Sequence, residues 1–156
     1  MHQKNIDTAE LPVPPPFIVL GFLIVGLILS ALFPVDLLPI APRLILGVLL
    51  VSIGLLIAAS AIRLMRRAGT AVDPFEPTSA IVSDGPYQFS RNPIYLSLAL
   101  AYLGIAIALN ALCALALWPI MLVALTDVVI VREEKYLERK FGDAYKQYKA
   151  SVHRWL

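Results

Sequence analysis

The fold is decided by the segment from Ile94 to Val131, which reads IYLSLALAYLGIAIALNALCALALWPIMLVALTDVVIV, 38 residues with a single charged side chain, Asp127. A helix that crosses the bilayer core needs roughly 20 apolar residues, because that core is about 30 Å thick. The segment is therefore too long for one crossing and suits two. Asn110 stands near its middle, at the natural turn of an antiparallel hairpin formed by residues 94–109 and 112–131.

Two more uncharged stretches lie upstream of this hairpin. The first, from Phe17 to Val35, follows three consecutive prolines, and the second, from Leu44 to Ile62, lies between two arginines. They predict helices at about 17–35 and 43–64. The residues before the first stretch carry one lysine and two acids, and no clear cleavage motif follows it, so we expect a retained helix rather than a signal peptide.

The composition agrees with a membrane protein. Hydrophobic residues make up 59% of the 156 residues and charged residues 15%, whereas soluble domains are roughly 45–50% apolar. A soluble chain of this length has too little interior to bury so much apolar surface. A single cysteine excludes a disulfide scaffold, and a net charge of +2 argues against an isolated nucleic-acid-binding module. The sequence predicts an all-α, integral membrane bundle of about four transmembrane helices, with residues 1–156 as one membrane domain.

The distribution of Lys and Arg predicts the orientation of this bundle. Cytoplasmic loops of membrane proteins carry an excess of these residues. Arg43 alone falls between the first two helices, and the other twelve of the thirteen basic residues fall on the opposite side. We therefore expect both termini, the loop 65–93 and the tail 132–156 to be cytoplasmic. The twelve are Lys4, Arg63, Arg66, Arg67, Arg91, Arg132, Lys135, Arg139, Lys140, Lys146, Lys149 and Arg154.

The loop 65–93 is the first candidate for a functional segment. Its four prolines prevent a regular helix, and Asn92-Pro93 at its end is a good helix start, with Asn as N-cap and Pro at the first helical position. A helix N-terminus offers free N–H groups and partial positive charge, which favour a carboxylate. The alternative is a capped helix beside an interfacial aromatic belt.

The tail is the second candidate. Apolar and aromatic residues recur there at helical spacing opposite a lysine- and arginine-rich face, which predicts a C-terminal amphipathic helix, with Gly142 as a C-cap and Asp143 as the cap of a second short helix. Such a basic helix often lies on the membrane surface. The adjacent acids Glu133 and Glu134 need a compensating cation, either nearby lysines or a cationic ligand. The apolar face comprises Val131, Leu137, Phe141, Tyr145, Tyr148 and Val152.

Three other features are less informative. Asp127 is an ionisable group within a span and precedes Glu134 by seven residues, so we expect both on one helix face, and Asp127 is either functional or near enough to the interface to reach it. Gly47 and Gly54 also share a face and are expected at helix contacts. No Cys or His spacing indicates a metal site.

Together the two candidate segments resemble a known family. Gly85-Pro86-Tyr87 and Arg91-Asn92-Pro93-Ile94-Tyr95 are similar to the G-P-Y-x-x-x-R-H-P-x-Y signature of the isoprenylcysteine carboxyl methyltransferase family. Arg132-Glu133-Glu134, Phe141-Gly142 and the tyrosines that follow resemble that family's ending, E-E-x-x-L-x-x-x-F-G-x-x-Y-x-x-Y. The related phospholipid methyltransferases share the paired glutamates. The resemblance covers about residues 70–156, and the family's usual His is Asn92 here.

The resemblance implies a small, bacterial-type integral membrane methyltransferase that binds S-adenosylmethionine at the cytoplasmic end of the bundle and acts on a lipophilic acceptor. It implies that Glu133 and Glu134 compensate the ammonium of the cofactor or hydrogen-bond its ribose and adenine. The cofactor carboxylate is then held by Arg91, Asn92 and the helix N-terminus at Pro93. Tyr87 and Tyr95 pack the cofactor, and Arg132 orients an anionic acceptor. An inner-membrane location follows from the same resemblance.

Two other classes of protein remain open on the sequence alone. One is an NADPH-dependent reductase of sterol type, whose members resemble this tail but are much larger. The other is a non-catalytic membrane protein, either a small transporter subunit or a lipid-binding scaffold, in which Asp127 and the basic tail serve passage or anchoring. Binding of S-adenosylmethionine, of NADPH or of neither distinguishes the three.

Overall fold

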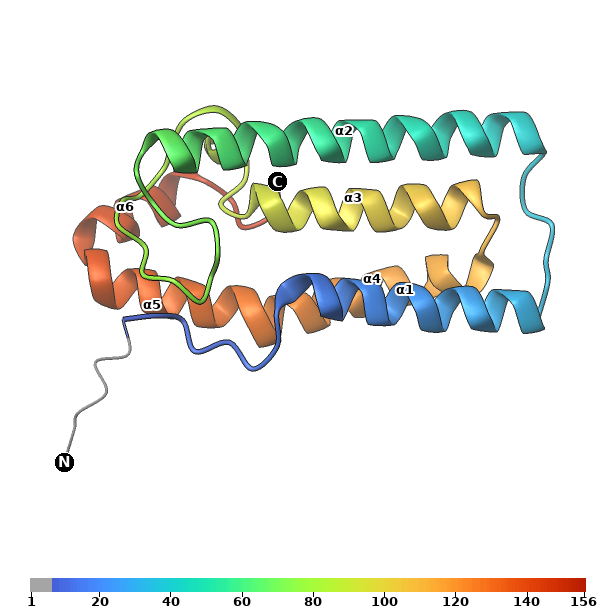
Figure 1. Cartoon of the computed structure of the whole chain (residues 1–156), viewed down its shortest axis with the longest axis horizontal. Coiled ribbons are helices and arrows are strands. Elements are labelled where there is room, and N and C mark those ends of the chain that lie inside the picture. Colours follow the sequence, from blue (N-terminus) through green and yellow to red (C-terminus); the bar gives the residue numbers. More distant parts are fainter. Residues whose placement is uncertain (1–6) are drawn as a thin grey trace.

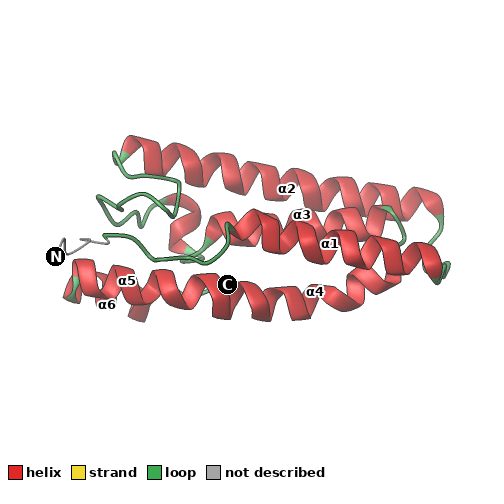
Figure 2. Ribbon diagram, turned by 60° about the horizontal axis from the view of Figure 1, so that its bottom comes forward, coloured by secondary structure: helices red, strands yellow, loops and turns green. Residues whose placement is uncertain are grey.

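The computed structural model describes residues 7–156, and within that range it contains helices, turns and loops but no strand (Figures 1 and 2). The described part of the chain forms a long bundle with a polar extension at one end. The helices are α1 (Pro15–Leu32), α2 (Ile40–Arg67), α3 (Pro93–Ala108), α4 (Leu112–Leu125), α5 (Val131–Phe141) and α6 (Asp143–Ser151), with a 3₁₀ turn η1 (Gly85–Gln88) and a π-helical turn η2 (Thr126–Ile130).

The prediction of an all-helical membrane bundle is confirmed, with shifted boundaries. The first helix ends at Leu32, three residues before the predicted end, because Pro34 disfavours helical backbone at the residue before it. The second begins directly after Pro39 and continues to Arg67, so the predicted loop 65–93 starts later. Among residues 7–156, three helices are long and apolar enough to cross a membrane, whereas α3 is shorter, with 16 residues or about 24 Å at 1.5 Å per residue.

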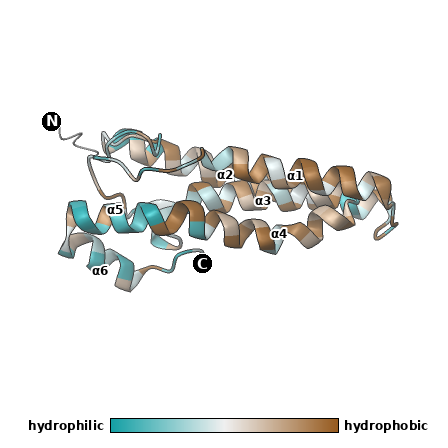
Figure 3. Cartoon of the chain, turned by 90° about the horizontal axis from the view of Figure 1, so that it is seen from below, coloured by the Kyte–Doolittle hydropathy of each residue, from teal (hydrophilic) through white to brown (hydrophobic). Residues whose placement is uncertain are grey.

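The outer surface of the bundle is apolar. Phe17 of α1 is 64% exposed, and Ile45 and Leu56 of α2 are 69% and 71% exposed. In Figure 3 the four bundle helices are coloured mainly as hydrophobic residues, and the colour changes to that of hydrophilic residues at α5 and α6. Apolar side chains exposed over so much of a surface are stable in lipid and costly in water. The exposed residues therefore mark the surface that faces the hydrocarbon of the bilayer.

Small residues bring the bundle helices together in two pairs. α2 packs chiefly against α3, and α1 packs chiefly against α4. A β-carbon added at Gly47 of α2 would lie 2.6 Å from the carbonyl oxygen of Gly104 in α3, and one added at Gly26 of α1 would lie 2.5 Å from the Cα of Ala114 in α4. The helix contact predicted for Gly47 is confirmed. Without a hydrophobic driving force between helices in lipid, such close backbone packing is what holds the pairs.

Asn110 closes the end of the bundle opposite the polar extension. It adopts a left-handed backbone (φ 54°), which Asn tolerates better than most residues, and so makes the turn between α3 and α4. Its side-chain oxygen accepts hydrogen bonds from the backbone N–H groups of Leu37 and Leu38, and its amide donates to the carbonyl of Val35. One residue therefore makes the predicted turn and also fixes the loop between α1 and α2.

The last bundle helix does not end where its apolar sequence ends. Its apolar part stops at Val131, and through η2 the chain continues without a break into α5, which carries the paired glutamates beyond the span. A π turn is wider than an α turn and shifts the helical phase. Asp127 is exposed, whereas Glu134 is only 4% exposed, so the two carboxyls differ in environment. The common face predicted from their spacing stays a prediction.

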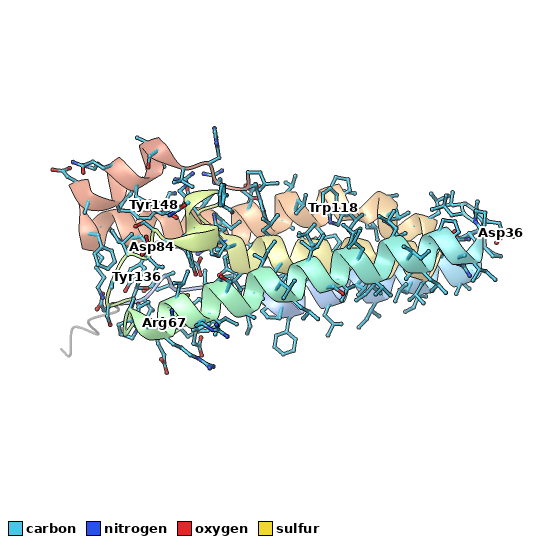
Figure 4. The ribbon with its side chains drawn as sticks, turned by 90° about the horizontal axis from the view of Figure 1, so that it is seen from above. Asp36, Arg67, Asp84, Trp118, Tyr136 and Tyr148 are labelled. Atoms are coloured by element: carbon cyan, nitrogen blue, oxygen red, sulfur yellow. The ribbon has the colours of Figure 1, made fainter. Side chains whose placement is uncertain are left out.

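Loops and tail helices gather at one end of the bundle. Figure 4 shows Arg67, Asp84, Tyr136 and Tyr148 at this end and Asp36 at the other. The loop between α2 and α3, together with α5 and α6, forms this polar end. With the C-terminal part of α2 and the segment after α6, it carries eleven of the twelve basic residues that were predicted to share a side. Lys4, the twelfth, lies outside the described residues.

Gly47 and Gly21 form a matched pair for testing the helix packing. We expect Gly47→Ala to lower the free energy of unfolding by about 1–3 kcal/mol, the usual cost of overpacking, because its β-carbon would meet backbone. Gly21→Ala should be neutral or stabilising, since nothing lies within 4 Å of that position and Ala is the better helix former. Thermal unfolding midpoints in detergent measure both, and equal shifts would contradict the packing described here.

Candidate active site

A cavity of about 300 Å³ lies at the polar end of the bundle. This volume is at the lower end of the range for small-molecule sites, roughly 300–1,000 Å³. Seven of the eight predicted site residues line it, namely Tyr87, Arg91, Asn92, Pro93, Tyr95, Glu133 and Glu134. Arg132, the predicted catalytic residue, is exposed and is not among the lining residues, so the structure does not bring it to the cavity.

Three elements bring these residues together. The turn η1 and the start of α3, with Pro93 as its first residue, supply one wall. α4, η2 and α5 follow one another without a break and place the two glutamates beside the start of α3. Gly142, with a positive φ of 56°, then reverses the chain, so that α6 folds back beside the cavity. Figure 1 shows α5 and α6 side by side at this end.

Glu133 is a carboxyl without a cationic partner among residues 7–156. The hydroxyl of Tyr95 donates a hydrogen bond to its Oε1 at 2.5 Å. Burial raises the pKa of Glu133 to about 7, against the opposing effect of that hydrogen bond. A cation that entered the cavity would favour the ionised form of this carboxyl.

Glu134, the adjacent residue, is in the opposite situation. Arg154 donates to both of its carboxylate oxygens, from Nε at 2.9 Å and from Nη2 at 2.8 Å. Nη2 of Arg91 lies 3.2 Å from Oε1, and Nζ of Lys149 lies 4.0 Å from Oε2. Although burial opposes ionisation, the hydrogen bonds from Arg154 and the nearby positive charges hold the pKa of Glu134 below its usual range. The protein itself therefore compensates this charge.

Two of the three guanidinium nitrogens of Arg91 make no hydrogen bond to the described residues. Its side chain is 7% exposed, and Nη2 lies beside Glu134, whereas Nε and Nη1 are buried and have no hydrogen-bond partner within the described part of the chain. Leaving a buried donor of a charged group unsatisfied costs more than about 1–3 kcal/mol. Arg91 lines the cavity, so a turn of its guanidinium would bring these donors to an anionic ligand there, and a carboxylate matches the geometry of a guanidinium.

Asn92 occupies the N-cap position of α3, as predicted, but its side chain does not cap the helix. Instead its amide nitrogen donates to the carbonyl oxygen of Arg154 at 3.0 Å, and the hydroxyl of Ser90 donates to the same oxygen at 3.3 Å. The side-chain cap predicted from sequence is wrong, because the C-terminal segment provides a competing acceptor. Its predicted contact with a cofactor stays a prediction.

The aromatic face of the tail points toward the cavity rather than toward the membrane surface. Tyr145 is 3% exposed and lines the cavity, and the hydroxyl of Tyr148 donates to the carbonyl of Tyr87 at 2.7 Å. Gly142 ends α5 as predicted. The predicted cap at Asp143 is wrong: Gly142 is the N-cap of α6, and Asp143 pairs with Lys146. The second short helix predicted after Gly142 is present as α6.

Sequence reasoning missed Tyr136 and Arg154. The hydroxyl of Tyr136 accepts a hydrogen bond from the N–H of Thr78 at 3.1 Å and donates to the carbonyl of Asp7 at 2.8 Å, which joins three distant segments at the cavity wall. Tyr136 falls outside the apolar spacing of the tail, and Arg154 reads as one more basic residue there. No local signal distinguishes either residue, since both depend on long-range contacts.

The fold and the site together define a class of protein. It is a helical membrane protein whose polar end contains a cavity lined by both acidic and basic side chains. Comparison with protein families gives the particular one: residues 42–144 match the phospholipid methyltransferase family, and the chain belongs to it. This range contains the first signature segment and the second one as far as Gly142, and it ends in the first turn of α6. The resemblance noted from the sequence is therefore confirmed, and family membership places the chain among methyltransferases of lipid-related substrates.

Two curated relatives match parts of the chain. An uncharacterized protein of Haemophilus influenzae is 45% identical over 64 residues, which are 40% of this chain and the whole of that protein. The protein-S-isoprenylcysteine O-methyltransferase of Schizosaccharomyces pombe is 33% identical over 72 residues, 46% of this chain but only 30% of the yeast protein. No solved structure matches the chain significantly.

Removing the charge of Glu134 should destabilise the folded protein. In Glu134→Gln three cationic side chains lose their buried counter-charge, and breaking a buried pair costs about 3–5 kcal/mol. Glu138→Gln is the matched control, because Glu138 is more exposed and pairs with Lys149 alone, which predicts a loss of about 0–1 kcal/mol. Thermal unfolding midpoints without ligand compare the two variants; similar midpoints would refute the structural role of Glu134.

Proposed function

We propose that the protein transfers a methyl group from S-adenosylmethionine to a lipophilic or membrane-embedded acceptor. One observation carries the proposal: the cavity is lined by a carboxyl, on Glu133, that has no cationic partner among residues 7–156, and by Arg91, two of whose guanidinium nitrogens have no acceptor in that range. The methionyl part of the cofactor carries an ammonium and a carboxylate on one carbon. Each unpaired group of the wall is thus complementary to one charge of that part.

The assignment of roles follows from the two glutamates. Glu133 is the better candidate to compensate the ammonium or to bind the ribose or adenine, because three protein cations already surround Glu134. Nε and Nη1 of Arg91 would hold the carboxylate, near the N-terminus of α3 at Asn92 and Pro93. Tyr87 and Tyr95 line the same cavity and would pack the cofactor.

The apolar part of the cavity suits a lipophilic acceptor. It is lined by Met65 from the end of α2, by Pro16 from the start of α1, and by Ile94 and Leu98 from α3. An acceptor with an apolar chain would therefore find a compatible wall next to the polar groups. A carboxylate, a thiol or an amine is a suitable methyl acceptor. Arg132, exposed one residue before the glutamates, would orient an anionic acceptor from outside the cavity.

The chemistry requires alignment and exclusion of water. When bound, the cofactor supplies an electrophilic methyl group on a sulfonium, and an acceptor displaces the thioether in line, so positioning at about 3–3.5 Å supplies much of the rate enhancement. A thiolate or carboxylate acceptor needs no general base. Its attack neutralises opposite charges, which a site without water favours. The protein would therefore hold the cofactor and the methyl acceptor in this alignment between α3, α5 and α6.

We further propose that the polar end of the bundle faces the cytoplasm of a bacterial inner membrane. The support is the segregation of basic residues, because eleven lie at this end and Arg43 lies near the other. Reporter fusions to the C-terminus that are active only in the cytoplasm or only in the periplasm test the orientation.

Ligand-dependent stability tests the proposed function most directly. S-adenosylmethionine and S-adenosylhomocysteine at 100 times their dissociation constant should stabilise the purified protein by about 2.7 kcal/mol, whereas NADPH should not. In Arg91→Ala the shift should be much smaller, because the carboxylate loses its donors. A shift with NADPH alone would favour a sterol-type reductase, and no shift with any of the three would favour a non-catalytic membrane protein.

The affinity for S-adenosylhomocysteine should depend on pH through Glu133. Below pH 7 the neutral carboxyl must lose a proton before it can compensate an ammonium, so affinity should rise with pH up to about 7 and then level off. The slope below this point is at most about tenfold per pH unit. Calorimetric titrations between pH 5.5 and 8.5 measure it, with Glu133→Gln as control. An equal slope in that variant would exclude Glu133 as its source.

A further inference from the structure

The C-terminal segment after α6 packs against the start of α3. The backbone N–H of Arg91 donates to the carbonyl of His153 at 3.0 Å, and Ser90 and Asn92 both donate to the carbonyl of Arg154. Trp155 is partly buried and packs against the hydrophobic core. The segment is thereby fixed at a wall of the cavity, although Arg154 is not among the lining residues.

Arg154 reaches the cavity through Glu134. Its guanidinium occupies both oxygens of that carboxylate, and Oε1 also lies 3.2 Å from Nη2 of Arg91. Glu134 therefore lies between two arginines and makes its better contacts with Arg154. A single nitrogen of Arg91, Nη2, faces Glu134, and Nε and Nη1 have no partner among residues 7–156.

We infer that Arg154 is a positioning residue for the cofactor carboxylate, an inference that rests on the proposed function. By holding Glu134 in a bidentate pair, Arg154 prevents that carboxylate from turning fully onto Arg91. Without Arg154, Glu134 would be free to pair bidentately with Arg91 and to take the donors that the cofactor needs. The segment after α6 thus completes a binding site. With the signature motifs alone, Glu134 would neutralise Arg91.

Two ligands separate this role from a purely structural one. S-adenosylhomocysteine carries the amino acid group, and 5′-methylthioadenosine lacks it. Arg154→Ala should weaken binding of S-adenosylhomocysteine by about tenfold or more, the size expected for hydrogen bonds to a charged group, and leave binding of methylthioadenosine unchanged. Arg154→Lys, which keeps the charge but loses the planar fork, should give an intermediate loss. Calorimetric titration of each variant with each ligand measures these affinities.

Lys146→Ala is the matched control, because Lys146 lies on α6 in an exposed ion pair with Asp143. It should bind both ligands like the wild-type protein. An equal loss of both ligands in Arg154→Ala would overturn the positioning role in favour of a general disruption of the site. Unchanged affinity for S-adenosylhomocysteine would overturn it as well.

A second measurement tests the packing of the C-terminal segment without any ligand. The chain has two tryptophans, so in a Trp118→Phe background the fluorescence emission reports on Trp155 alone. Arg154→Ala should shift this emission to longer wavelength and Lys146→Ala should not; an unshifted spectrum would contradict the anchoring of the tail. If the wild-type protein binds neither adenosyl ligand, the proposed function fails and the positioning role with it, while the emission shift still tests the anchoring.

Discussion

The carboxylate of Glu134 lies almost fully buried where α5, α6 and the start of α3 meet, and its contacts with Arg91, Lys149 and Arg154 link these elements. A buried charge is costly unless several partners compensate it, so these elements must be in place together. The polar end of the molecule is organised around this constraint. Glu133, one residue earlier, has no cationic partner among the described residues and lines the cavity.

The bundle provides a rigid base for that arrangement. Close packing at Gly47 and Gly26 fixes α2 against α3 and α1 against α4. Because α4, η2 and α5 are continuous, the position of α4 also determines where the two glutamates lie. The start of α3 and the start of α5 therefore have a defined separation. A site assembled on helices in this way is better fixed than one assembled on loops, although one wall here is a proline-rich loop held by Tyr136.

Much of the fold was predictable because the membrane imposes simple rules. Uncharged stretches of about 20 residues must be helical in lipid, and this rule located all four apolar helices within a few residues. The site residues were predictable only as a set, from two motifs that lie far apart in the chain. The different roles of these residues were not predictable from sequence. Glu133 and Glu134, for example, are adjacent and identical in type, and they differ only in which side chains contact them.

The sequence by itself determined an all-helical membrane bundle, its polar end and the seven residues that line a common cavity, because hydrophobicity and local motifs are properties of the chain. The tertiary structure decided which charges are satisfied. Asn92 donates to the C-terminal segment instead of capping a helix, and the aromatic face of the tail turns inward. Arg154 pairs with Glu134 across 20 residues of sequence. The physical reason is that ion pairs and buried hydrogen bonds depend on distances of a few ångströms, which only the packed chain sets.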